Sequence, residues 1–122
     1  MAEVLEQDAP AKPRGSVRNF ASLMEQVLQE NDWKGGWGGL TSGYLLRRLS
    51  QELRELRKAV KTCSLMREHP WNRTNEAYDE AKQMVAREAA DVANFSMMIA
   101  EVLGDVGLAN RPKKKTAKVR WR

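Results

Sequence analysis

Apolar residues recur at spacings of three and four along three stretches of the chain, which is the pattern of amphipathic helices. The stretches predict helices over about residues 17–30, 43–66 and 75–103. Residues 105–110 give only a weak indication of a short final helix. Side chains able to cap the three helices stand at Ser16, at Thr41 or Ser42, and at Thr74.

No stretch alternates apolar and polar residues as a strand would, so the expected fold class is all-α. A short turn around Pro70 joins the two long helices and predicts an antiparallel helical hairpin. The 75–103 helix is apolar over most of its circumference after residue 84. This apolar surface is larger than the short 17–30 helix can cover. We therefore expect the hairpin and the short helix to assemble as a four-helix-bundle homo-oligomer.

Composition narrows the class of protein further. The 122 residues are 42% hydrophobic and 30% charged, as in a folded domain, and no apolar run is long enough to span a membrane. A single Cys and a single His exclude an intrachain disulfide and zinc sites built from several Cys or His residues. With no signal-peptide pattern at the N-terminus, the expected location is the cytoplasm.

The net charge of +5 is concentrated at one end. Residues 110–122 hold seven of the 21 Lys and Arg residues and no acid, so the rest of the chain has a net charge of −2. The expected organisation is a flexible leader over 1–15, a helical domain over 16–109 and a basic tail over 110–122. The tail is either a solvated end or a nucleic-acid contact, with Trp121 able to stack on a base.

Two acids interrupt the apolar face of the 75–103 helix. At about 100° per residue, Glu88 and Asp91 lie on the same side as Phe95 and Ile99. Burying an unpaired carboxylate costs several kcal/mol, on the order of the stability of a small domain. These two side chains therefore need a partner.

Glu52 and Glu55 lie three residues apart at the border of the leucine stripe of the 43–66 helix. They could form salt bridges on a solvated face, and Arg48 could form a buried ion pair with Glu88 and Asp91. If the two helices pack face to face, however, four carboxylates meet and repel one another unless a cation lies among them. Oxygen ligands without Cys or His favour a hard ion, Mg²⁺ or Mn²⁺.

The paired motifs Glu52-x-x-Glu55 and Glu88-x-x-Asp91 resemble those of the MazG-like all-α nucleoside triphosphate pyrophosphohydrolases. The surrounding sequence over about residues 33–104 is also similar, above all to the phage and bacterial branch linked to dATP and dGTP hydrolysis. The most specific segment is EAADVANFSMMIAE at 88–101. The chain departs from many members at Gln51, where they carry a further acid.

The resemblance implies hydrolysis of a (d)NTP between the α and β phosphates, giving a nucleoside monophosphate and pyrophosphate. It implies that Glu52, Glu55, Glu88 and Asp91 bind two or more Mg²⁺ or Mn²⁺ ions, with Glu52 orienting the attacking water. It also implies a dimer or tetramer, and a phage-encoded enzyme would act in the host cytoplasm. A pyrimidine dNTP house-cleaning role is the alternative within this class. Outside it, the alternative is a non-enzymatic helical protein that binds nucleic acid through the basic tail.

Further residues are candidates for substrate binding. Lys34 and Arg48 are candidate phosphate contacts, and each could equally be an ordinary surface cation. Trp33 and Trp37 flank a glycine-rich loop and could stack on a base, or one of them could fill the core. Asn94, one turn beyond Asp91, could bond a sugar hydroxyl or hold a metal-ligating carboxylate, or it could be a buried amide bonded to the backbone.

Overall fold

A computed structural model describes residues 12–31, 33 and 36–112, and all regular structure in these ranges is helical. Three longer helices are α2 (Gly15–Glu30), α3 (Ser42–Glu68) and α4 (Asn75–Leu103), and α5 (Val106–Ala109) is a single turn. The 3₁₀ turn η1 (Pro70–Asn72) joins α3 to α4. The all-α prediction is confirmed, and the weakly indicated final helix is present.

Two of the predicted caps are confirmed. The Thr41 hydroxyl accepts a hydrogen bond from the Tyr44 amide at 3.1 Å, and the Thr74 hydroxyl accepts one from the Ala77 amide at 3.0 Å. The prediction of Ser16 as a cap is wrong. Because α2 already begins at Gly15, Ser16 lies inside its first turn, and Arg14 stands at the cap position without a capping side-chain bond.

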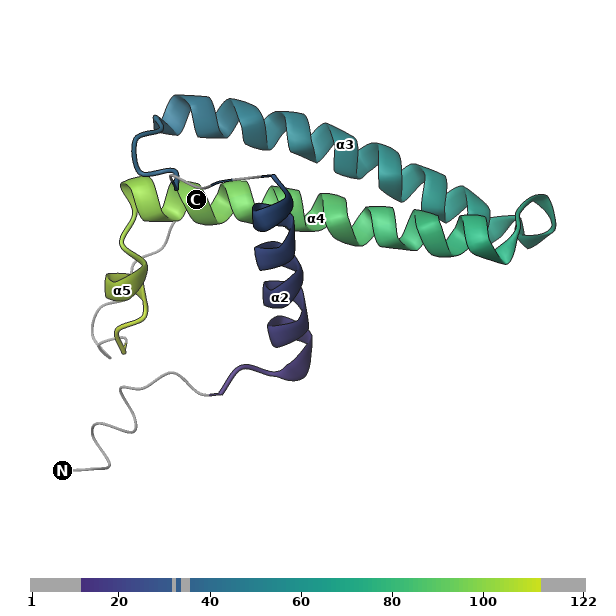
Figure 1. The fold of residues 1–122 in the computed structure, drawn as a ribbon, viewed down its shortest axis with the longest axis horizontal. Helices are drawn as coiled ribbons and strands as arrows, with labels where there is room; N and C mark the ends of the chain where they lie inside the picture. Colours follow the sequence, from purple (N-terminus) through teal and green to yellow (C-terminus); the bar gives the residue numbers. More distant parts are fainter. Residues whose placement is uncertain (1–11, 32, 34–35, 113–122) are drawn as a thin grey trace.

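The long helices α3 and α4 run side by side as an antiparallel hairpin, as predicted (Figure 1). At its closed end, Arg73 Nε donates a hydrogen bond to the Met66 carbonyl at 2.7 Å, which ties the turn to the end of α3. Helix α2 crosses α4 steeply near the middle of the hairpin (Figure 1). The hairpin therefore forms the frame, and α2 covers part of one side of α4.

The core lies toward the open end of the hairpin. Leu45 on α3 and Met98 on α4 are fully buried, and Phe95 is 5% exposed. The loop before α3 packs against them through Trp33, Trp37 and other apolar side chains. On α4, Met97, Met98 and Ile99 all belong to this cluster or contact it.

None of the helices in the described ranges combines the length and apolarity that a membrane crossing requires. Most of the predicted leader and most of the predicted basic tail, including Trp121, lie outside the described residues, as does Lys34.

Candidate metal centre

The two interior acids of α4 meet one acid of α3 where the helices pack. Glu88 and Asp91 share a face of α4, and the antiparallel contact places Glu52 opposite them. One carboxylate oxygen from each of Glu52, Glu88 and Asp91 lies within 4.8 Å of the others. All three residues are half-buried, and the Glu52 side chain is only 15% exposed. We call these three residues the carboxylate cluster.

The protein environment opposes ionisation of the two acids that α4 contributes to this cluster. Burial, followed by the charges of Asp91, Glu52 and Glu55, raises the pKa of Glu88 above its ordinary value. Burial and then the charge of Glu52 raise the pKa of Asp91, although Arg87, a bond from Asn31 and Arg48 act in the opposite direction. The neighbouring cations therefore leave part of the negative charge uncompensated.

Arg48 is the closest cation to the cluster. One of its guanidinium nitrogens is 2.9 Å from Glu52 Oε1, and the other donates to Gln51 Oε1 at 2.5 Å. The guanidinium also lies 5.1 Å from the centre of the Phe95 ring. Gln51, where many MazG-like proteins carry an acid, thus helps to orient Arg48. Because a carboxylate has two oxygens, Glu52 retains one that Arg48 does not contact.

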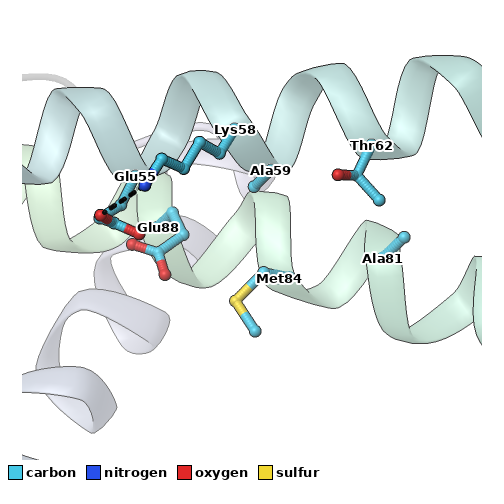
Figure 2. Close-up of a pocket in the computed structure, with 7 residues that line it drawn as sticks. All are labelled: Glu55, Lys58, Ala59, Thr62, Ala81, Met84 and Glu88. Carbon is cyan, nitrogen blue, oxygen red and sulfur yellow. Dashed lines mark ion pairs between the residues drawn. The ribbon is translucent and has the colours of Figure 1, made fainter.

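Glu55 lies beside the carboxylate cluster and is not one of its members. Its side chain is 53% exposed, and its carboxylate is 3.6 Å from Lys58 Nζ. Figure 2 shows the carboxylates of Glu55 and Glu88 close together at the mouth of a cavity of about 310 Å³, which Ala59, Ala81 and Met84 also line. Of the four predicted acids, three converge and the fourth adjoins them.

A second cavity, of about 330 Å³, lies on the other side of the cluster, next to the end of α2. Its lining combines Glu52, Asp91 and Arg48 with Asn31, Trp33 and Phe95. The Trp33 ring packs edge-on against Phe95, with the ring centres 6.0 Å apart. Trp33 and Arg48 therefore lie in one cavity with two of the acids, and Trp33, like Trp37, also packs against the core.

Asn31 is a site residue that the sequence did not reveal. Its side-chain Nδ2 donates to Asp91 Oδ1 at 3.4 Å, and it follows the last residue of α2. An ion pair between Arg87 and Glu30 joins the same two helices next to it. The only signal in the sequence was an Asn at the end of a predicted helix, which does not indicate the direction of its side chain.

Two further candidates lie away from both cavities. Trp37 packs against the core, and its indole Nε1 donates to Glu101 at 3.0 Å. Asn94 is 3% exposed, and its Nδ2 donates to the Met24 carbonyl of α2 at 3.1 Å. Of the roles considered for these side chains, the structure shows core packing for Trp37 and a buried amide bonded to backbone for Asn94.

Comparison of this chain with protein-family models, with curated proteins and with solved structures finds no match. The fold and the site define an all-helical protein in which carboxylates cluster between two antiparallel helices. The resemblance to the MazG-like enzymes therefore rests on the sequence motifs alone.

Proposed function

We propose that this protein is a metal-dependent (d)NTP pyrophosphohydrolase, which cleaves the α–β phosphate bond to give a (d)NMP and pyrophosphate. The observation that carries the proposal is the convergence of Glu52, Glu88 and Asp91 within 4.8 Å. A purely structural cluster of this kind would destabilise the fold without an evident gain, because its members repel one another and lose solvation.

The donor set fits a hard divalent cation. Glu52, Glu88 and Asp91 would hold Mg²⁺ or Mn²⁺ through carboxylate oxygens, and Glu55 would join them if its side chain left Lys58. Such ions, when bound, neutralise phosphate charge and lower the pKa of water.

The remaining groups of the site support a nucleotide as the ligand. The cavity next to α2 presents an indole, Trp33, which can stack on a base, and a guanidinium, Arg48, which can contact phosphate. Glu52, oriented by Arg48, is the group we assign to positioning the attacking water. The water oxygen bonds to the α phosphorus and gives up a proton to a carboxylate of the site, while the bond from this phosphorus to the α–β bridging oxygen breaks and that oxygen leaves with the pyrophosphate. The proposed purine deoxynucleotide preference rests on the motif resemblance, and a pyrimidine substrate remains the alternative.

We propose in addition that the active form is a homo-oligomer, a dimer or a tetramer. On α3, three apolar side chains recur at intervals of seven residues and remain in solvent: Leu46 is 53%, Leu53 39% and Val60 43% exposed. A seven-residue repeat is the spacing of a helix–helix seam. A second hairpin packed on this stripe would complete a four-helix bundle.

The test is pyrophosphate release from each of the eight common NTPs and dNTPs with Mg²⁺ or Mn²⁺. Activity is expected with dATP or dGTP and is expected to be lost with a chelator and in Glu88→Gln. The matched control is Glu80→Gln, which removes an exposed acid from the same helix. If the folded, metal-supplied protein releases no pyrophosphate from any nucleotide, the proposed function is wrong.

A further inference from the structure

The outward face of α3 carries a row of cations. Arg47, Arg54, Arg57, Lys58 and Lys61 are all exposed. Within the described residues, the structure shows one ion pair to this row, from Lys58 to Glu55 at 3.6 Å. We call these five residues the basic face.

The cations stand at spacings that bring their charges together. Arg54 precedes Arg57 by three residues and Lys58 by four, and Arg57 precedes Lys61 by four. Residues three or four apart are neighbours on a helix surface, and like charges at these spacings destabilise it. A helix face that is required only for solubility can alternate Glu with Lys, whereas this face carries a row of cations. The basic face therefore retains a repulsion that a bound polyanion would relieve.

Four of the five cations of the basic face lie away from the carboxylate cluster, whereas Lys58 also lines the cavity that Glu88 borders. At about 100° per residue, Arg54 and Lys61 lie roughly 160–180° around α3 from Glu52, on the opposite side of the helix.

The exposed apolar residues Leu53 and Val60 lie about 100° from Arg54 and Lys61. Arg57 is the one cation near this apolar stripe, about 40–60° from it, and the other four lie about 100° or more away. An anionic lipid surface would have to engage the stripe and those four cations at once, and this separation disfavours it.

We propose that the basic face binds the phosphate backbone of duplex nucleic acid without sequence preference. Arg47 to Lys61 spans about 21 Å of straight helix, enough to contact several phosphates. Ser50 is a small polar side chain on the same face, and it adds a hydroxyl donor for phosphate oxygens. The aromatic side chain nearest the row is Tyr44, which is 37% exposed and has the Arg47 guanidinium over its ring, 5.8 Å from the ring centre. The cations are therefore the groups that would make the contact, and they contact the backbone rather than base edges. This inference does not depend on the proposed hydrolase activity.

The experiment measures binding of the full-length protein to a fluorescent 20-base-pair DNA by anisotropy across a salt series. The test variant is Arg54→Gln/Arg57→Gln/Lys61→Gln, which leaves Lys58 and the cavities intact. The control variant is Arg14→Gln/Arg67→Gln/Lys82→Gln, which removes the same charge from exposed positions elsewhere. Circular dichroism establishes that both variants are folded, and two unrelated DNA sequences test for sequence preference.

The test variant is expected to bind at least about tenfold more weakly at low salt. Its slope of log K against log salt concentration should flatten by about 2–3, as the loss of three phosphate contacts requires. The slope of the control variant should change by less than one. The proposal is overturned if both variants lose affinity equally, if removing residues 113–122 abolishes binding that the test variant retains, or if the protein prefers anionic vesicles to DNA. An absence of DNA binding by the parent protein overturns it as well.

Discussion

Replacing Glu88 by Gln should change the stability of this protein in opposite directions with and without a divalent ion. Glu88 is the acid whose pKa is raised by burial and by three neighbouring carboxylates, with no cation acting against them. The substitution keeps the size of the side chain and removes its charge. Without a metal it removes a repulsion, and with a metal it removes a ligand.

The repulsion can be sized from the geometry. Two unit charges 4.8 Å apart repel by about 0.9 kcal/mol in water and about 3.5 kcal/mol at an effective dielectric of about 20. The cluster is half-buried, and Arg48 already offsets part of the charge of Glu52, so a net gain of about 1 kcal/mol is expected for metal-free Glu88→Gln. For a domain of this size, that corresponds to a rise in Tm of roughly 4–8 °C.

The effect of the metal has the opposite sign. An ion at 100 times its Kd stabilises the parent protein by about 2.7 kcal/mol, because it binds the folded state alone. The variant lacks a ligand from the centre of the cluster and should gain little. The order of stability should therefore reverse, with the variant more stable in chelator and the parent more stable in millimolar Mn²⁺ or Mg²⁺.

Thermal and urea unfolding, followed by circular dichroism at pH 7 in both buffers, measure this reversal. Glu80→Gln is the control and should show the metal response of the parent. A variant less stable than the parent in chelator would mean that Glu88 forms a stabilising ion pair. An equal metal response in both proteins would mean that the ion binds elsewhere, and either result would refute the reasoning.

Three further predictions concern the carboxylate cluster, the contact between α2 and α4, and the exposed apolar stripe of α3. In the presence of a chelator, the free energy of unfolding should fall as pH rises above the ordinary pKa values of these carboxyl groups, 3.8 for Asp and 4.5 for Glu, because Glu88 and Asp91 bind protons more tightly in the folded state. A pH series of urea titrations measures this slope. A stability that rises with pH over that window would contradict the prediction. Asn94→Ala should destabilise the protein by about 1–3 kcal/mol, because the Met24 carbonyl loses its side-chain donor in a buried contact. Urea unfolding checks this value, and an unchanged midpoint would exclude a stabilising role for the bond. Leu53→Asp should convert the proposed oligomer to monomer in light scattering while helicity is retained, and an unchanged mass would place the interface elsewhere.

The helices and their order could be predicted from the sequence because they depend on local interactions. Apolar periodicity located α3 and α4 to within a few residues, and Thr41 and Thr74 capped them as predicted. Ser16 was misplaced because a serine beside Gly15 can stand either before or inside the first turn, and nothing local decides between them.

The same local rule revealed part of the candidate site. A separation of three residues places Glu88 and Asp91 on one face of a helix wherever that helix packs, and the apolar residues around them showed that the face turns inward. The sequence alone therefore predicted that Glu88 and Asp91 require a compensating partner.

Only the tertiary structure decided which groups lie next to the carboxylates of Glu88 and Asp91. Glu52 enters the carboxylate cluster, whereas Glu55, three residues away on the same helix, remains half in solvent beside Lys58, because the register of α3 against α4 turns one toward the interface and the other toward its edge. The contact between Asn31 and Asp91 joins residues 60 positions apart. Periodicity fixes how side chains are arranged around one helix, but the axial offset and rotation of one helix against another depend on packing across the whole interface, and no local pattern encodes them.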